Sequence, residues 1–441
     1  MRSPLKKKRI ETAVQAESAR ALDMALQIHA WAEPPLKEKK SARLIADYLA
    51  EAGFSVTFPF PKIPTAFRAA RGKGKPAIGF LGEYDALPNC GEKEGTWGHG
   101  CGHNLLGVAS AVAAVAAARV LEAAGRSGRA VYYGCPAEEQ LHGKIYMARD
   151  GAFRELDACL AWHPWKRIQA VPYGGSALDS LLFTFSGRTA HAAGNPHEGR
   201  SALDGVLLMD VAVNYLREHI PENVRIHSVI PRGGDAPNVV PAAAAIWYYL
   251  RGRNRAEVDA IRARVRACAR GAALATGTRV RMDLLDAIYH RLPNLALHEL
   301  LLENLSLFGG PRADSGDRRR ARALGLPPEF DCRVHGEFPP QYRASSDDEN
   351  VSWLAPLGSF YMVTHVKSTS IHHRNVTAQM RLPFAMKGML QAAKVMAGAA
   401  ADLACDPKRM KRVREEFRKG TRGFTYDPLI SRRRSVPRLF G

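Results

Sequence analysis

Residues 77–88 read AIGFLGEYDALP, and residues 98–118 read GHGCGHNLLGVASAVAAVAAA. The apolar run that opens the first stretch predicts a buried strand ending in a polar loop. The second stretch turns at glycines and continues as an alanine-rich segment to about residue 124, which predicts a helix. Because its side chains are small, this helix can pack closely against a sheet. A strand, a polar loop and a closely packed helix in this order predict an α/β layer.

The same alternation continues along the chain. Residues 130–133 and 158–162 are further strand candidates, and polar residues follow each of them. Residues 12–51 have helical spacing of apolar residues, interrupted by Pro34 and Pro35. The sequence therefore predicts a mostly parallel sheet flanked by helices, with polar side chains gathered at the carboxyl ends of its strands.

The pattern changes at about residue 175. We expect strands over 180–186, 225–230, 243–250 and 278–285, and helices over 201–218 and 255–275. The order β-α-β-β-α-β is the ferredoxin-like arrangement, a complete unit inserted into the first. The expected division is a discontinuous catalytic domain at 11–174 and 290–407, an inserted lid or dimerisation domain at 175–289, and basic tails at 1–10 and 408–441.

Composition and charge limit the possible classes of protein. The chain has 441 residues, of which 46% are apolar, so it can bury a core and is not mainly disordered. Its net charge of +20 suggests a polyanionic partner, but most of the excess lies in the two terminal segments. Such runs are usually solvated, and hardly any aromatic residues stand among them for base stacking. We therefore expect no nucleic-acid partner.

The cysteines and the apolar runs indicate the cellular compartment of the protein. Seven cysteines are spread thinly, without the spacing of a disulfide scaffold, which suits a reducing compartment. The basic N-terminus is not followed by the apolar run of a secretory signal, and the apolar stretch at 105–118 falls short of a membrane span. The expected location is cytoplasmic, without membrane attachment.

Four short stretches combine residue types that bind metals. They are residues 99–103 (HGCGH), residues 136–139 (PAEE), His163 after a strand, and His372 beside His373. Each stretch alone can be explained without a metal, since a lone histidine is more often structural and a Glu-Glu pair is common at helix starts. Together in one α/β frame, with Asp85 at a neighbouring strand end, they favour a metal site over these explanations.

A resemblance to a known family becomes specific at this point. The matching motifs are GEYDALP (82–88), GHGCGHN (98–104), YGCPAEE (133–139), WHP (162–164), GRTAHAA (187–193), APNVVP (236–241), SSD (345–347), VSW (351–353), IH (371–372) and YDPL (426–429). They resemble the co-catalytic metallopeptidase family of aminoacylases and glutamate carboxypeptidases. Within it they are most similar to the amidohydrolase branch that includes p-aminobenzoyl-glutamate, hippurate and indole-acetyl-amino-acid hydrolases, and above all to the p-aminobenzoyl-glutamate group.

The resemblance implies a site and a cofactor. It implies a zinc-peptidase-like catalytic domain that binds two divalent ions, manganese or zinc. Glu138 would be the catalytic base, and Asp85 would be the carboxylate that holds a metal-binding histidine in place. The implied metal ligands are Cys101, His103, Glu139, His163 and His372. His191 and Asn238 of the inserted domain match groups that reach the substrate, sometimes across a dimer interface. Arg251 is a candidate partner for a substrate carboxylate, although a surface position on its strand fits it nearly as well.

Several positions depart from the family pattern. Residues 140–143 (QLHG) stand where a glycine-rich run is expected, and the stretch 309–343 is longer and more basic than expected. His373 beside His372 leaves two candidates for the last ligand, and the spacing to residues 376–379 favours His372.

The resulting functional prediction is a metal-dependent amidohydrolase. Glu138 would take a proton from a metal-activated water, which attacks the amide of an N-acyl or N-aroyl amino acid resembling p-aminobenzoyl-glutamate, or of a related dipeptide. His191 would stabilise the oxyanion. The alternatives are another N-acyl amino acid, such as hippurate or an indole-acetyl conjugate, or a catalytically silent scaffold with basic tails. We expect a homodimer, with a heteromer of related chains as the alternative.

Overall fold

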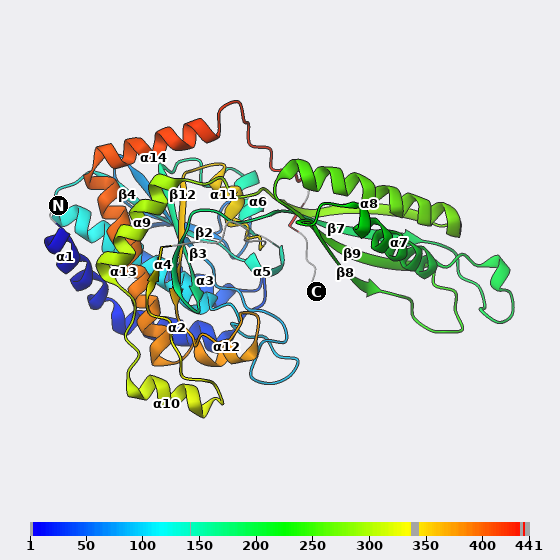
Figure 1. The fold of residues 1–441 in the computed structure, drawn as a ribbon, viewed down its shortest axis with the longest axis horizontal. Helices are drawn as coiled ribbons and strands as arrows, with labels where there is room; N and C mark the ends of the chain where they lie inside the picture. Colours follow the sequence, from blue (N-terminus) through cyan, green and yellow to red (C-terminus); the bar gives the residue numbers. More distant parts are fainter. Residues whose placement is uncertain (1–2, 142, 337–343, 433–434, 437–441) are drawn as a thin grey trace.

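The protein folds around two separate β-sheets. The computed structural model describes residues 3–141, 143–336, 344–432 and 435–436. One sheet has eight strands in the order β1-β2-β4-β3-β5-β12-β6-β11, and the other has four in the order β10-β7-β9-β8. Figure 1 shows the four-stranded sheet with its two helices as a lobe that extends away from the larger one. The predicted α/β fold class is confirmed.

The larger lobe contains the described residues before 172 and after 294. Its strands are β1 (Ser55–Thr57), β2 (Phe67–Lys73), β3 (Ala77–Gly82), β4 (Gly128–Gly134), β5 (Ala158–Trp165), β6 (Ile168–Val171), β11 (Val334–His335) and β12 (Leu357–Val363). Its helices are α1 (Ser3–Ala16), α2 (Ser18–Trp31), α3 (Lys39–Glu51), α4 (His103–Ala123), α5 (Glu138–Leu141), α6 (Gly143–Arg149), α9 (Leu295–Phe308), α10 (Ser315–Ala323), α11 (Asp348–Ser352), α12 (Arg374–Gln379), α13 (Pro383–Cys405) and α14 (Pro407–Gly420).

Four central strands of the large sheet are parallel. β3 pairs in parallel with β4 and β5, and β5 pairs in parallel with β12, while β2 and β6 run antiparallel to their neighbours β4 and β12. Parallel pairing brings the carboxyl ends of β4, β3, β5 and β12 to one edge. Polar residues that follow these strands in the sequence therefore meet in space.

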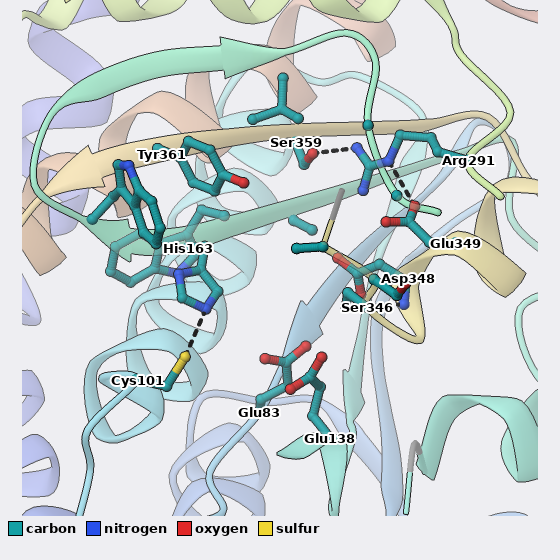
Figure 2. A pocket seen from close by; sticks show the side chains of 18 of the residues that line it. Glu83, Cys101, Glu138, His163, Arg291, Ser346, Asp348, Glu349, Ser359 and Tyr361 are labelled. Carbon is teal, nitrogen blue, oxygen red and sulfur yellow. Dashed lines mark hydrogen bonds and ion pairs between the residues drawn. The ribbon is translucent and has the colours of Figure 1, made fainter. Parts of the chain in front are cut away.

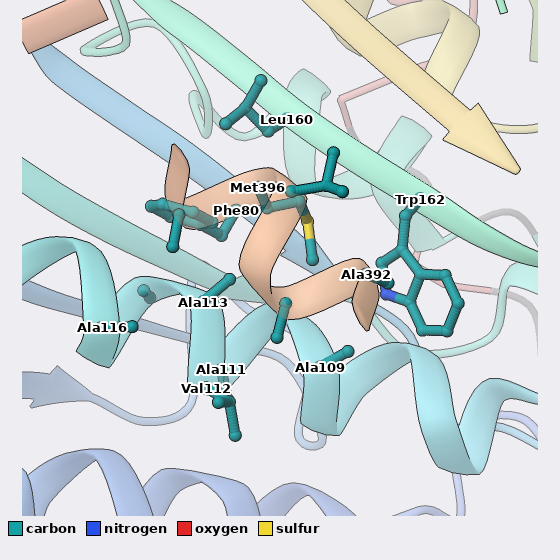
Figure 3. Close-up of a cluster of buried hydrophobic side chains, with 14 of the residues drawn as sticks. Phe80, Ala109, Ala111, Val112, Ala113, Ala116, Leu160, Trp162, Ala392 and Met396 are labelled. Atoms are coloured by element: carbon teal, nitrogen blue, oxygen red, sulfur yellow. The ribbon is translucent and has the colours of Figure 1, made fainter. Parts of the chain in front are cut away.

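Helix α4 is the central packing element of the larger lobe. It is buried along almost its whole length and packs against both the sheet and the neighbouring helix α13. Figure 3 shows Ala113 and Ala116 of α4 near Phe80 of β3, and Ala109 of α4 nearer Ala392 of α13. Among the described residues, α4 is the one helix long and apolar enough to cross a membrane, and 94% of its apolar window is buried inside the protein. Its apolar character is that of a core helix.

The smaller lobe has the predicted ferredoxin-like order. Its elements are β7 (Ala177–Ser186), α7 (Ala202–Leu216), β8 (Arg225–Arg232), β9 (Ala243–Gly252), α8 (Arg255–Thr276) and β10 (Arg279–Ile288), with short 3₁₀ turns at Pro196–Glu198 and Arg217–His219. Asn254 caps α8 at its start, and Gly277 ends it with a φ of +63°. The expected domain limits at 174/175 and 289/290 stay a prediction.

The segments 3–10 and 408–420, expected as basic tails, are helical and contact other helices of the larger lobe. Residues 3–10 belong to α1, where Lys6 is buried and its Nζ lies 2.8 Å from Asp402 Oδ2. Residues 408–420 belong to α14, which Asp406 caps and which buries Met410 and Val413. Apolar residues at helical spacing among the basic ones give each segment a face to bury, which net charge alone does not reveal.

Two other predicted features fall partly outside the described residues. His142 of the bulkier loop after Glu139 and residues 337–343 of the basic stretch lie outside them. Within that stretch, α10 begins at a capping box formed by Asp314 and Asp317.

We expect Gly107→Ala to destabilise the larger lobe. A Cβ at Gly107 would lie 2.6 Å from the backbone oxygen of Glu83, so α4 would have to move away from the end of β3. Overpacking of this kind costs about 1–3 kcal/mol of unfolding free energy, measurable by urea denaturation.

The matched control is Gly271→Ala on α8. A Cβ there meets no atom within 4 Å, so the substitution should stabilise its helix by up to about 1 kcal/mol. Equal effects of the two substitutions would contradict the close packing inferred at Gly107.

Candidate metal and active site

The predicted ligand residues converge at the carboxyl edge of the large sheet. Asp85 follows β3, Glu138 and Glu139 follow β4, and His163 lies near the end of β5. The turn before α4 places Cys101 and His103 beside them. Gly102 makes this turn with a φ of +81°, and a Cβ there would lie 2.9 Å from Pro164, so glycine is required.

Cys101, His103 and His163 form one group of possible metal ligands. Their ligand atoms all lie within 4.8 Å of one another. Cys101 Sγ is 3.2 Å from His163 Nε2, and His163 Nδ1 is 2.7 Å from the Pro164 carbonyl oxygen. His103 Nδ1 is 2.8 Å from Asp85 Oδ1, so its Nε2 faces the group. In each histidine one ring nitrogen is fixed by an oxygen acceptor and the other is directed at the site, as in protein metal centres.

Cys101, Glu139 and His372 form a second group of the same kind. His372 Nε2 lies 3.4 Å from Glu139 Oε2, and His372 adopts a left-handed φ of +61° while its backbone N–H donates to Gly100 O. The neighbouring His373 instead caps α12 and accepts a hydrogen bond from the Asn375 N–H. The geometry thus directs His372 and not His373 toward the site. Because Cys101 belongs to both groups, its thiol is their common point.

Burial controls the electrostatics of the site. Burial and the nearby charge of Glu139 raise the pKa of the Cys101 thiol well above its ordinary value. Burial lowers the pKa of His163 to about 3. Burial also raises the pKa of Glu138 well above its usual range, and the charges of Glu83 and Glu139 add to this effect. A thiol and several carboxylates held in one buried place need a cation to ionise together.

The donor set fits divalent metal ions. His103 Nε2 and Glu139 Oε1 are buried and have no hydrogen-bond partner among the described residues, although Glu83 Oε2 lies 3.2 Å from His103 Nε2. Unpaired buried polar atoms are costly, and metal ligation would satisfy both. One sulfur, imidazole nitrogens and a carboxylate are a set that zinc and related ions accept.

A buried lysine below the site was not predicted from the sequence. Lys144 of α6 is inaccessible to solvent, and its Nζ contacts Glu83, Asp347 Oδ1 at 2.5 Å and Asp348 Oδ1 at 3.3 Å. Burial alone would lower the pKa of Lys144, but these carboxylates hold it well above its ordinary value. The ion cluster ties the end of β3 to the start of α11. No local sequence signal marks Lys144, because its partners lie about 60 and 200 positions away.

A cleft of about 240 Å³ opens above the two ligand groups. Figure 2 shows Glu83, Glu138, Cys101 and His163 on one side of it, with Arg291 and Glu349 across the cavity. Arg251 also lines the cleft, and its Nη1 donates to Ser345 Oγ at 2.9 Å. Sequence reasoning missed Arg291, which joins the cleft from the segment after β10.

His191 and Asn238 lie elsewhere in this chain. Both are exposed in the smaller lobe, where His191 forms an isolated bridge with Val239 and the Ala192 N–H donates to the Asn238 carbonyl oxygen. Neither is among the described residues that line the cleft. The structure therefore places these two predicted residues together, but not at the cleft of their own chain.

The fold and the site define a hydrolase-like α/β protein that has a cleft able to hold metal ions. Its second lobe has the form of a separate small domain. Comparison with known proteins identifies the family. Residues 176–276 match the peptidase dimerisation domain of the M20 family. One of the subunits of Escherichia coli p-aminobenzoyl-glutamate hydrolase is 36% identical, over 93% of this chain and 95% of that protein. The human Xaa-Arg dipeptidase is 30% identical, over 91% of this chain and 89% of its own length.

A solved structure agrees in fold. The Bacillus subtilis dinuclear metal-binding peptidase of the M20 family superposes with a TM-score of 0.57 at 17% identity, covering 88% of this chain and 99% of that one. The chain belongs to the M20 family of peptidases and amidohydrolases. The resemblance seen in the sequence and the prediction that the protein is an enzyme are confirmed.

We expect Lys144→Met to destabilise the larger lobe strongly. The substitution keeps the shape but removes the buried cation between the Glu83 and Asp347 carboxylates, which costs about 3–5 kcal/mol in urea denaturation. The control is Lys75→Met, which removes an ion pair with Asp157 whose lysine is 60% exposed and should cost about 0–1 kcal/mol. A loss at Lys144 no larger than that at Lys75 would show that the buried cluster does not stabilise the fold.

Proposed function

We propose that the protein is a metal-dependent amidohydrolase that cleaves the amide bond of an N-acyl or N-aroyl amino acid, or of a related dipeptide. The observation that carries this proposal is the meeting of two ligand groups at Cys101, with the Glu138 carboxyl beside them in an open cleft. The names of the relatives support it, since they include p-aminobenzoyl-glutamate, hippurate and indole-3-acetyl-aspartic acid hydrolases and a dipeptidase.

Two divalent ions, manganese or zinc, are the proposed cofactor. His103 and His163 would hold one ion and Glu139 and His372 the other, and Cys101, which belongs to both groups, would be a further ligand. When bound, such ions supply Lewis acidity, which lowers the pKa of water and polarises an amide carbonyl. Asp85 would position both sets of ligands, because it contacts His103 and also accepts a hydrogen bond from the Glu139 N–H at 3.0 Å.

Glu138 is the proposed general base. It lines the cleft close to Glu83 and Glu139, and burial together with those two charges raises its pKa, which makes its carboxylate a stronger proton acceptor once a bound cation favours ionisation. Glu138 would accept the proton of the attacking water and return it to the leaving amine nitrogen. The neighbouring Glu139 differs in having its backbone and carboxylate fixed toward Asp85 and His372.

A guanidinium group is the proposed partner of the substrate carboxylate. Arg251 and Arg291 both line the cleft. Arg291 is buried, its Nε bonds Glu349 at 2.8 Å and its Nη1 bonds Ser359, while its Nη2 makes no hydrogen bond with any described residue. Glu349 and Ser359 hold the Arg291 guanidinium in place, and its Nη2 could donate a hydrogen bond to a substrate carboxylate. We therefore favour Arg291 over Arg251, the candidate from the sequence, as the partner of that carboxylate.

A homodimer would complete the site. We propose that His191 and Asn238 serve the cleft of a second copy, where His191 would stabilise the oxyanion. The smaller lobe carries exposed apolar residues on one stretch of α7 and on the edge strand β8, namely Leu207, Leu208, Val211, Tyr215, Val229 and Ile230. An exposed apolar patch beside an open strand edge is typical of a pairing surface. A heteromer with a related chain is the alternative, since two different subunits of Escherichia coli p-aminobenzoyl-glutamate hydrolase both match this chain.

We expect Glu138→Gln and Glu139→Ala to separate catalysis from metal binding. Protein reconstituted with manganese or zinc should release glutamate or another amino acid from a panel that includes p-aminobenzoyl-glutamate, hippurate and acyl amino acids. Glu138→Gln should retain its metal content and lose at least about 100-fold in kcat, since it removes the proton acceptor. Glu139→Ala should lose one metal ion per chain by elemental analysis.

Two results would count against these assignments. If the wild-type protein releases no amino acid from the whole panel, the proposed reaction is wrong. If both variants retain the same metal content, the roles of Glu138 and Glu139 are misassigned.

We expect the double variant Leu207→Asp with Val211→Asp to be monomeric. Two charges in the α7 patch would have to be desolvated on pairing, so the dimer should dissociate in sedimentation analysis and activity should fall with it. The control is Leu26→Asp on α2, which is 45% exposed in the larger lobe and should leave the assembly unchanged. A double variant that stays dimeric would place the interface elsewhere.

A further inference from the structure

An aromatic pair lies at the cleft and has no role in the proposed reaction. Trp165 at the end of β5 and Tyr361 of β12 both line the cavity, and their rings stack with centroids 5.0 Å apart and planes 22° apart. Each ring also meets the edge of His163, at centroid distances of 6.3 and 6.2 Å. Both side chains are only half-buried, so the pair presents apolar surface to the cleft directly beside a candidate metal ligand.

Strand β12 sets the distance between this pair and the guanidinium side of the cleft. Ser359, which bonds Arg291, and Tyr361 are two residues apart on β12, so they face the same side of the sheet about 6.6 Å apart along the strand. Figure 2 shows Tyr361 near His163 and Arg291 beyond Ser359 on the opposite side of the cavity. The cleft therefore has an aromatic end and an end that carries the Arg291 guanidinium beside Glu349, with the ligand groups on its floor.

This arrangement matches a molecule with a flat apolar group at one end and a carboxylate at the other. Val171 and Ile371 add apolar lining to the cleft, while the opposite side carries the ion pair of Arg291 and Glu349. Aromatic rings favour another ring at stacking distance over an aliphatic chain, because the stacked contact adds to the gain from burial. An amide bond between the two end groups would then lie over Glu138 and the ligand groups.

We propose that Trp165 and Tyr361 form the binding surface for an aromatic acyl group, so that the enzyme selects aroyl over aliphatic acyl amino acids. This inference rests on the proposed function and assigns the acyl side of its substrate to these two rings. Tyr361 and Trp165 are then specificity residues: they determine which acyl group binds, while the reacting atoms are handled by other side chains.

The test compares two substrates that share their amino acid, benzoyl-glutamate and acetyl-glutamate, on metal-reconstituted protein. The wild type should have at least about a tenfold lower KM for benzoyl-glutamate. Trp165→Leu and Tyr361→Leu should each raise the KM for benzoyl-glutamate about tenfold and change that for acetyl-glutamate less than about threefold. Tyr361→Phe keeps the ring and should behave as wild type. Leucine variants that affect both substrates equally would overturn the proposal.

A binding measurement keeps the two proposals distinguishable. Calorimetric titration of Glu138→Gln protein with the same two compounds measures affinity without turnover, and the preference for benzoyl-glutamate should disappear in the Trp165→Leu background. If this preference is found although wild-type protein hydrolyses neither compound, the result supports the aromatic subsite and contradicts the proposed amidohydrolase reaction. If Trp165→Leu instead weakens acetyl-phenylalanine and not benzoyl-glutamate, the rings bind the amino-acid side chain and the proposal is wrong.

Discussion

The carboxylate of Asp85 joins the two halves of the candidate metal site. One oxygen contacts His103 Nδ1 at 2.8 Å and the other accepts a hydrogen bond from the Glu139 N–H at 3.0 Å. Asp85 is itself buried at the end of β3, and although burial alone would raise its pKa, the interaction with His103 lowers it. A single fixed anion thus orients a candidate ligand from α4 and another from the end of β4. Without it, the two elements would share an edge of the sheet but not a common centre.

Close packing of α4 is what brings His103 to Asp85. Gly107 allows the helix to approach the backbone of Glu83, and Gly102 makes the left-handed turn that places Cys101 ahead of the helix. Small residues along α4 let it pack closely against both the sheet and α13. The alanine-rich run therefore contributes to the geometry of the site, because it sets the distance between the helix and the sheet.

Much of this could be predicted from local sequence. The strand before Glu83, the helix after His103 and the β-α-β-β-α-β lobe follow from periodicity, and the ligand candidates follow from residues that share strand ends. Strand β2 was missed because FRAARGK interleaves arginines with small residues, and its apolar face is defined only by pairing with β4. Lys144 and Arg291 were missed because their partners are distant in sequence. The spacing favoured His372 over His373, and the structure adds the physical reason, since the His372 side chain lies near Glu139 and His373 caps α12.

The central claim is that the two ligand groups that meet at Cys101 would hold two divalent metal ions. Anomalous diffraction from crystals of the full chain grown with manganese or zinc tests it most directly. We expect two peaks about 3.5–4 Å apart, with His103 and His163 on one, Glu139 and His372 on the other, and Cys101 Sγ within bonding distance of at least one. A single peak, or two peaks that leave Cys101 unbound, would contradict it.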